Sequence, residues 1–278
     1  MTSITRRGAA AGLIGAGAAA AAGARSAPAY SQGPNRKTFV LVHGTWHGGW
    51  CWVHVADRLR ALGHRVITPT ATGCGERAHL IEPETGLETH ITDMVRAIEW
   101  EELEDVILIG HSFSGITITG VADRIPERIR HIAFFDALIP TEARSAAIMP
   151  DPETGEYPQW WLDRLPAFED GYKMSFWDHY PAKMLVPEDD AENIAWLRRR
   201  LTWHPVRQWT DRLQLENGGW EPHARTCIHC VGQVYNPSSE AMIGPGRGPG
   251  WRFIELDTAR NGFMTDPDAV TECFLSLA

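Results

Sequence analysis

The fold is decided by the stretch Val106-Ile107-Leu108-Ile109-Gly110-His111-Ser112-Phe113-Ser114-Gly115. An apolar, strand-like run ends at Gly110, a serine follows two residues later, and helix-like residues come next. A tight turn from strand to helix lifts the hydroxyl of such a serine out of the top of a sheet. The turn is crowded, so the neighbouring positions must be small. Gly110 meets this requirement, whereas Ser114 stands where glycine is usual and Gly115 follows it. The stretch predicts a nucleophile elbow at Ser112, although an ordinary strand–helix turn has similar features.

Strand-like and helix-like segments alternate on both sides of this stretch. Apolar, β-rich runs cover residues 38–43, 64–69, 105–109, 129–135, 226–231 and 252–256. Helix-like runs cover residues 50–62, 89–103 and 116–125, and Asp266-Pro267 opens a terminal helix. This alternation predicts an α/β fold with a mostly parallel sheet and helices on both faces. We expect the ligand site at the carboxyl ends of the strands, where Ser112 lies.

The composition changes between about residues 138 and 225. This segment is rich in proline, has no clear strand and contains seven tryptophans: Trp160, Trp161, Trp177, Trp196, Trp203, Trp209 and Trp220. We expect a helical insertion that forms a lid over Ser112. Most of its tryptophans should pack the lid onto the sheet, and two or three should line a pocket.

The amino terminus has the features of an export signal. A pair of arginines, Arg6-Arg7, precedes a run of alanine and glycine, and small residues that allow cleavage follow. The arginine pair and the mild hydrophobicity favour twin-arginine export. A lipid-spanning helix is the alternative, but an Ala/Gly segment this short spans a bilayer poorly. We expect a signal peptide over residues 1–29, a folded domain over residues 30–278, and a bacterial protein exported to the periplasm or secreted, without a stable membrane anchor.

The composition also limits the kinds of partner that the protein can bind. The formal net charge of −9 argues against nucleic acid and anionic membranes, since both require basic surfaces. A small-molecule substrate is the expected partner, and no sequence feature defines the oligomeric state. The five cysteines cannot all pair with one another. Cys227 and Cys230 have redox-motif spacing but lie in a strand, where residues three apart face opposite sides. We therefore expect the cysteines to be small residues of the core.

A glycine-rich loop follows the first strand, with the sequence LVHGTWHGGWCW over residues 41–52. In serine hydrolases the loop at this place supplies one amide of an oxyanion hole, and the residue after the nucleophile supplies the other. We assign the amides of Thr45 and Phe113, each stabilising a transition state by about 3 kcal/mol. His43 and His47 have the spacing of a metal pair but lie in a loop, so no metal site is expected.

Three motifs together resemble the α/β-hydrolase superfamily: LVHGTWHGGWCW, TPTATGCGER over residues 68–77, and GHSFSG over residues 110–115. The likeness is strongest from Phe39 to Pro140. It is greatest to the branch of pyrethroid-hydrolase-like carboxylesterases, plant methyl esterases and hydroxynitrile lyases. The resemblance implies hydrolysis of an ester through Ser112, a lid and no cofactor. Hydroxynitrile lyases have a threonine after the first histidine of the loop, whereas this chain has Gly44, as the esterases do.

The catalytic histidine of that family has no counterpart in this chain. The histidine follows the last strand within a Thr-Gly-His-Asp-like turn, and Arg260 occupies its place in the matching residues 257–262. Arginine stays charged and has no acceptor, so it cannot take a proton from Ser112. The usual acid is absent from Gly232–Asn236, and Asp136 offers an alternative acid at the end of the preceding strand.

Two interpretations stay open. In the first, Ser112 hydrolyses a carboxylic ester of an apolar small molecule, and another histidine serves as base. The candidates are His47, His79, His111, His179, His204 and His223. In the second, the triad is lost and the protein is a lyase-like enzyme or a ligand binder. Arg260 then anchors a carboxylate or enolate beside the oxyanion hole, or pairs with an acid.

The expected site residues follow from these arguments. We expect Ser112 and Asp136 to be catalytic, and Thr45 and Phe113 to form the oxyanion hole. Contacts to the substrate are expected from His43, Trp46, His111 and Arg260. The acids available to pair with Arg260 are Asp136, Asp257 and Asp266.

Overall fold

The computed structural model describes residues 36–142, 145–232 and 242–277. The leader expected over residues 1–29 lies outside these residues, as does most of the loop in which the usual acid is missing. Within the described ranges, no helix has both the length and the apolar character needed to cross a membrane.

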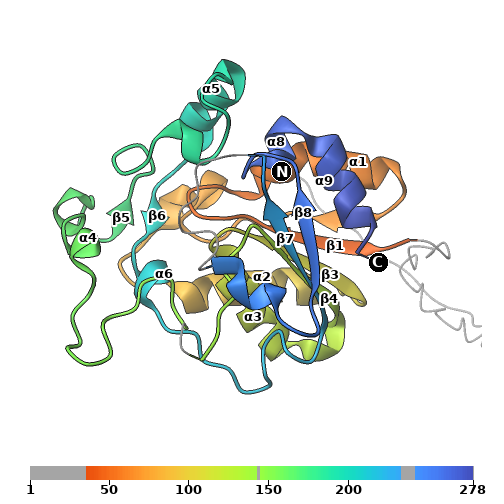
Figure 1. Ribbon diagram of the computed structural model, residues 1–278, viewed down its shortest axis with the longest axis horizontal. Helices are drawn as coiled ribbons and strands as arrows, with labels where there is room; N and C mark the ends of the chain where they lie inside the picture. Colours follow the sequence, from red (N-terminus) through yellow and green to blue (C-terminus); the bar gives the residue numbers. More distant parts are fainter. Residues whose placement is uncertain (1–35, 143–144, 233–241, 278) are drawn as a thin grey trace, which may run out of the picture. The chain divides into compact units, whose positions relative to one another are not determined.

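A six-stranded sheet with every pair of neighbours parallel forms the centre of the fold (Figure 1). Its order is β2-β1-β3-β4-β7-β8. The strands are β1 (Thr38–Val42), β2 (Arg65–Ile67), β3 (Val106–His111), β4 (Ile129–Phe135), β7 (Ala224–Cys230) and β8 (Arg252–Leu256). All six expected strands are therefore confirmed. Because the strands are parallel, their carboxyl ends lie at one edge of the sheet, and Ser112 directly follows β3 there.

Helices cover both faces of the sheet, as the alternating pattern predicts. α1 (Val53–Ala61), α8 (Gly262–Thr265) and α9 (Pro267–Leu275) contact one another on one face, and α2 (Leu87–Trp100) contacts α3 (Ser114–Arg124) on the other. The side chains of β1 alternate between two apolar clusters: Phe39 and Leu41 belong to the first, Val40 and Val42 to the second. Short 3-10 helices complete the chain: η1 (Gly49–Trp52), η2 (Gly75–Leu80), η3 (Pro126–Arg128), η4 (Leu165–Ala167), η5 (Ala182–Met184) and η6 (Gly244–Arg247).

The expected insertion lies between β4 and β7, on the left of Figure 1. Its helices are α4 (Gln159–Leu162), α5 (Ala191–Arg200) and α6 (Arg207–Thr210). The insertion also contains the two-residue strands β5 (Lys173–Met174) and β6 (His204–Pro205), which pair antiparallel. The expectation of no strand was therefore wrong in this detail, since two residues are too few to produce an alternating pattern.

The cysteines confirm the expectation of small core residues. All five are buried, and none forms a disulfide. Cys227 lies in one apolar cluster and Cys230 in the other, as residues three apart on one strand should.

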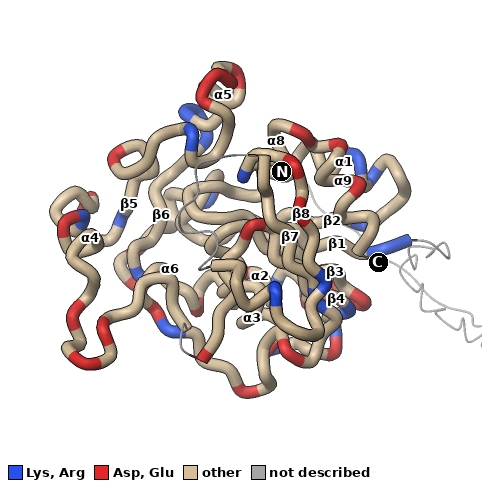
Figure 2. Tube along the Cα trace, viewed as in Figure 1, with Lys and Arg blue, Asp and Glu red and all other residues tan. Residues whose placement is uncertain are grey.

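Acidic and basic residues are interspersed along the described chain (Figure 2). Many form exposed pairs, such as Arg130 with Asp105 at 3.0 Å and Arg65 with Glu101 at 2.9 Å. Exposed pairs of this kind each stabilise a fold by about 1 kcal/mol or less. The charged surface therefore contributes little to the structure of the site, and the buried charges described below matter more.

Candidate active site

Ser112 lies in a strained turn between β3 and α3. Its φ of 57° falls in the left-handed region that side chains other than glycine rarely adopt. Two hydrogen bonds hold the turn: the Ser112 amide donates to the Phe135 carbonyl at 3.2 Å, and the Ser112 carbonyl accepts from the Leu138 amide at 2.8 Å. Backbone strain of this kind persists where the surroundings fix it, and it is concentrated at functional sites.

The crowding of the turn explains its unusual motif. A Cβ at Gly110 would lie 2.8 Å from Ile118, and a Cβ at Gly115 would lie 2.0 Å from the carbonyl oxygen of Leu138. Position 114 tolerates a side chain because the Ser114 hydroxyl turns toward backbone carbonyls, at 3.0 Å from Val42 and 2.8 Å from His111. The position that must be glycine is therefore 115, and Ser114 is compatible with the elbow.

Thr45 and Phe113, the two residues expected to form the oxyanion hole, lie at the same cavity as Ser112. Neither of their backbone amides donates a hydrogen bond within the part of the chain that is described. Amides without partners beside a serine hydroxyl are compatible with an oxyanion hole. Gly44 precedes Thr45, and a Cβ there would lie 2.9 Å from the Cβ of Ser112. A threonine at this position, as in the hydroxynitrile lyases, therefore requires the elbow to move.

The glycine-rich loop is fastened through Trp46 to the insertion between β4 and β7. The Trp46 amide donates to Nδ1 of His204 at 3.3 Å, and its indole donates to the Met174 carbonyl at 3.0 Å. The Trp46 carbonyl accepts from the Thr202 amide at 3.1 Å. These bonds fix the backbone beside Thr45, so the insertion holds the loop that carries the candidate oxyanion amide.

Arg260 contacts both the serine and the acid. Its Nη2 donates to Oγ of Ser112 at 2.7 Å, and its Nη1 donates to Oδ2 of Asp136 at 2.5 Å. Arg260 is 6% exposed and Asp136 is 2% exposed, so the ion pair is buried. Of the three acids considered for Arg260, the fold brings Asp136 to it. A guanidinium keeps its protons and cannot accept one, so Arg260 binds the serine oxygen but cannot take the serine proton.

Asp136 is held on more than one side. It directly follows β4 with a φ of 42°. Nδ1 of His229, on β7, lies 3.2 Å from its Oδ1, and the Cys230 amide donates to the same oxygen at 3.4 Å. The expected acid is thus present at the carboxyl end of the sheet, but a guanidinium stands between it and the serine where the family has an imidazole.

His47 and Asn261 were not expected to act together. Asn261 donates from Nδ2 to Nε2 of His47 at 3.0 Å, and His47 donates from Nδ1 to the Thr45 carbonyl at 2.7 Å. Burial lowers the pKa of His47 to about 3, so its ring is neutral at ordinary pH. The pair joins the oxyanion loop to the turn that carries Arg260. His47 is therefore occupied as a structural link, and no sequence signal identifies Asn261 as its partner.

No other histidine replaces the missing base within the described ranges, which contain all 12 histidines of the chain. There, the hydrogen-bond partner of Ser112 Oγ is Arg260. His111 packs against Phe263 with ring centroids 5.0 Å apart, and burial lowers its pKa well below the usual value. The remaining candidates, His79, His179, His204 and His223, form no hydrogen bond with the serine there. His111 and His43 do not line the Ser112 cavity, unlike Trp46 and Arg260.

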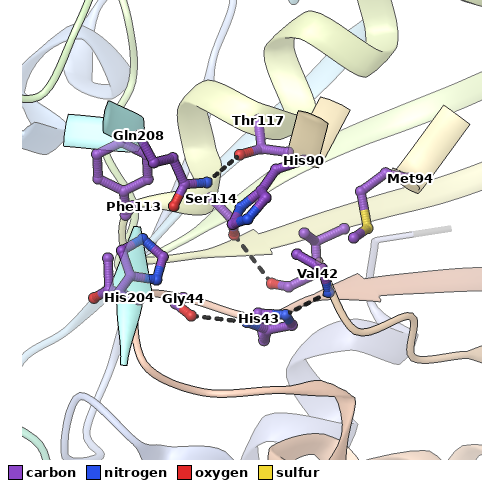
Figure 3. Close-up of a pocket in the computed structure, with 12 residues that line it drawn as sticks. Val42, His43, Gly44, His90, Met94, Phe113, Ser114, Thr117, His204 and Gln208 are labelled. Carbon is purple, nitrogen blue, oxygen red and sulfur yellow. Dashed lines mark hydrogen bonds between the residues drawn. The ribbon is translucent and has the colours of Figure 1, made fainter. Parts of the chain in front are cut away.

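His43 borders a second, smaller chamber behind the oxyanion loop (Figure 3). Its Nδ1 donates to the Gly44 carbonyl at 2.8 Å, and its Nε2 accepts from the Ala71 amide at 3.1 Å. His90 and His204 also line this chamber, whose volume of about 10 Å³ suits one water-sized molecule. Burial lowers the pKa of all three histidines. The chamber is thus a neutral, polar support behind Thr45 and Phe113.

The cavity above Ser112 is larger and mostly apolar. Its volume is about 190 Å³, and Arg260 is its single charged lining residue among those described. The apolar and aromatic lining residues are Trp46, Phe113, Leu138, Ala147, Ile148, Trp160, Tyr180, Met184, Trp209 and Met242. Two tryptophans of the insertion thus line the pocket, and others such as Trp161 are buried in the packing. No group of metal-binding side chains occurs among the described residues.

The chain belongs to the Alpha/beta hydrolase family, whose sequence profile matches residues 39–272. It is 36% identical over 241 residues to the carbendazim hydrolyzing esterase of Nocardioides sp. (strain SG-4G), spanning 86% of this chain and 98% of that one. It is 31% identical over 133 residues to Methylesterase 1 of Arabidopsis thaliana, spanning 46% and 50% of the two chains. The resemblance to esterases of this family is therefore confirmed.

A solved structure has the same fold. An extracellular α/β-hydrolase from a Paenibacillus species superposes with a TM-score of 0.71 at 23% identity, covering 87% of this chain and 99% of that one. At this identity the likeness establishes the fold alone. Together with the curated relatives, it makes this chain an esterase-type α/β hydrolase by descent.

Proposed function

We propose that the protein hydrolyses carboxylic esters of apolar small molecules, with Ser112 as nucleophile and the amides of Thr45 and Phe113 as oxyanion hole. One observation carries the proposal: Ser112 in its strained turn lines a mostly apolar cavity of about 190 Å³ together with Thr45 and Phe113, whose amides have no partners in the described chain. The esterase relatives support the type of reaction. The apolar lining supports an apolar substrate.

Arg260 gives this site an electrostatic group in place of a general base. Held by Asp136, the guanidinium lies 2.7 Å from Oγ of Ser112 and stabilises negative charge that develops on this oxygen. A positioned base ordinarily contributes about 10²- to 10⁴-fold to the rate. We therefore expect slower turnover than in a hydrolase with a complete triad, with hydroxide from the solvent taking the serine proton.

A serine-directed fluorophosphonate probe tests the nucleophile. The wild-type protein should form a covalent adduct, detected by intact-protein mass spectrometry, and Ser112→Ala should not. Ser114→Ala is the matched control, since this serine lies two residues from Ser112 and its hydroxyl bonds to the backbone carbonyls of Val42 and His111. Folded wild-type protein that remains unlabelled, or labelling that persists in Ser112→Ala, would defeat the proposal.

A second candidate follows from the hydrogen bond between Arg260 and Ser112. Because Oγ accepts from the guanidinium, the serine proton is free to point into the cavity, alongside the amides of Thr45 and Phe113. Three donors then converge, which suits a carboxylate or enolate ligand. This site would act as a lyase-like enzyme or a binding protein. It predicts ligand binding that survives in Ser112→Ala, and ester turnover that Arg260→His does not raise.

We also propose that the protein is exported. The arginine pair and the small-residue run over residues 1–29 support this, and the Paenibacillus relative is described as extracellular. The test is cell fractionation of the full chain, with Arg6-Arg7 changed to lysines. Retention of the double variant in the cytoplasm and export of the wild type would support the twin-arginine route. A wild type that stays in the cytoplasm would contradict it.

A further inference from the structure

We infer that the site hydrolyses esters whose alcohol half leaves as a stabilised anion, such as aryl and enol esters, far faster than it hydrolyses simple alkyl esters. The inference rests on the proposed function and adds the class of substrate. It is carried by the hydrogen bond from Arg260 to Ser112, which places a donor that cannot release its proton where acyl-transfer enzymes place a base.

With Arg260 in the place of an imidazole, two proton transfers of the usual reaction lose their catalyst. In a complete triad, one imidazole takes the proton of the serine and later gives it to the departing alcohol. In the described part of this chain, the one hydrogen-bond partner of Ser112 Oγ is Arg260. His47, a nearby alternative, already donates from Nδ1 and accepts at Nε2. The site thus has neither a base for the first step nor an acid for the second.

The reaction can proceed with hydroxide alone. Hydroxide takes the Ser112 proton and becomes water, and the serine oxygen forms a bond to the carbonyl carbon. The π electron pair moves to the carbonyl oxygen, which the amides of Thr45 and Phe113 receive. When this tetrahedral intermediate collapses, the C=O bond re-forms and the bond to the alcohol oxygen breaks. The alcohol oxygen leaves with the electron pair and without a proton.

The second half of the reaction balances in the same way. Hydroxide adds to the acyl carbon of the acylated Ser112, and the serine oxygen leaves as an anion. It then takes the proton of the new carboxylic acid, which restores the serine and releases a carboxylate. The whole reaction consumes one ester and two hydroxides, and it yields a carboxylate, the alcohol anion and water. Phenolates and enolates leave readily in this way. The serine alkoxide leaves with the Arg260 guanidinium beside it, whereas the alkoxide of a simple alcohol leaves without that help and therefore far more slowly.

The cavity suits an aromatic leaving group. Trp160, Tyr180 and Trp209 supply three aromatic rings, and the volume of about 190 Å³ accommodates a substituted benzene ring beside a short acyl chain. For comparison, an apolar cavity of about 150 Å³ in another protein binds benzene. The lining thus favours the same class of alcohol that the chemistry favours.

Butyrate esters with one acyl group and different alcohols test the inference. The series is 4-nitrophenyl, phenyl, trifluoroethyl and ethyl butyrate, and the measured quantity is kcat/KM of the wild type above that of Ser112→Ala. We expect kcat/KM to fall by about 10²- to 10⁴-fold from the phenyl to the ethyl ester, the factor that a positioned acid would supply. With the phenyl ester, the rate should rise about tenfold per pH unit from pH 6 to 9, since hydroxide is the base.

Three outcomes are distinguishable. A steep loss along the series with no plateau in the pH profile supports the inference. Serine-dependent hydrolysis of the ethyl ester within tenfold of the phenyl ester, or a plateau near neutral pH, overturns it and leaves the proposed function standing. Hydrolysis that does not depend on Ser112, together with no fluorophosphonate labelling, overturns the proposed function and this inference with it.

Discussion

Replacing Arg260 with methionine should destabilise the fold strongly, because it leaves a buried carboxylate without its cation. Asp136 is 2% exposed, and the guanidinium lies 2.5 Å from its Oδ2. Removing one partner of a buried ion pair costs about 3–5 kcal/mol. For a domain of this size, each kcal/mol shifts Tm by about 2–4 °C, so Arg260→Met should lower Tm by about 6–20 °C.

The measurement is urea and thermal unfolding followed by circular dichroism, in a double-mutant cycle with Asp136→Asn. The double variant should recover much of the loss, because the amide carries no charge to be buried alone. Arg130→Met is the matched control: its partner Asp105 lies 3.0 Å away, but the two side chains are 51% and 70% exposed. That variant should lose about 1 kcal/mol or less.

Two results would refute this reasoning. One is an Arg260→Met variant whose free energy of unfolding changes no more than that of Arg130→Met. The other is a cycle in which the effects of the two single substitutions simply add. Either result would mean that the His229 and Cys230 contacts, at 3.2 Å and 3.4 Å, satisfy the carboxylate on their own.

Further predictions concern the elbow, the buried histidines and the arginine turn. Gly115→Ala should abolish fluorophosphonate labelling and lower Tm, because the new Cβ would lie 2.0 Å from the Leu138 carbonyl oxygen; normal labelling would contradict this. Burial lowers the pKa of His47 to about 3 and of His90 to about 4, so the unfolded chain binds protons more readily. The resulting stability is complete above about pH 6.5 and is lost as the pH falls toward 4, which urea midpoints at pH 7, 5.5 and 4.5 would measure. A midpoint that stays constant would be inconsistent with neutral buried rings. Asn261→Ala should lower kcat for aryl esters several-fold more than a control substitution that lowers Tm by the same amount, since the bond of 3.0 Å to His47 positions the turn. Equal losses of kcat in the two variants would assign Asn261 a purely structural role.

The centre of the sheet was predictable from sequence because β1 and β3 are buried on both faces. Such strands appear as continuous apolar runs. The bounds of β4 and of the partly exposed edge strand β8 also match the predicted runs. The elbow was predictable because its geometry requires small residues at fixed positions. The sequence motif did not reveal which of positions 114 and 115 must be glycine. That depends on the Leu138 carbonyl, which belongs to the chain beyond the next strand.

The partners of the site residues were less predictable. Asp257, Asp266 and Asp136 all offered a carboxylate to Arg260, and the first two are within six residues of it. The actual partner is 124 residues away in sequence, because the ends of β4 and β8 meet at the same edge of the sheet. His47 was a candidate base because its loop also lies at the carboxyl edge of the sheet. The sequence around His47 does not show that its two ring nitrogens are already bonded to Thr45 and Asn261.

Arginine at position 260 keeps the geometry of a triad while changing its proton chemistry. An imidazole between an acid and a serine donates to the one and accepts from the other. The guanidinium makes both contacts, at 2.5 Å to Asp136 and 2.7 Å to Ser112, but it donates in both. An active enzyme and a binding protein with this fold therefore differ at position 260 in proton chemistry, and not in the backbone that carries the residue. The dependence of the rate on the leaving group and on hydroxide distinguishes the two, because the Arg260 guanidinium neither takes the serine proton nor protonates the leaving group. Both dependences should therefore be as steep as they are without a general acid or base.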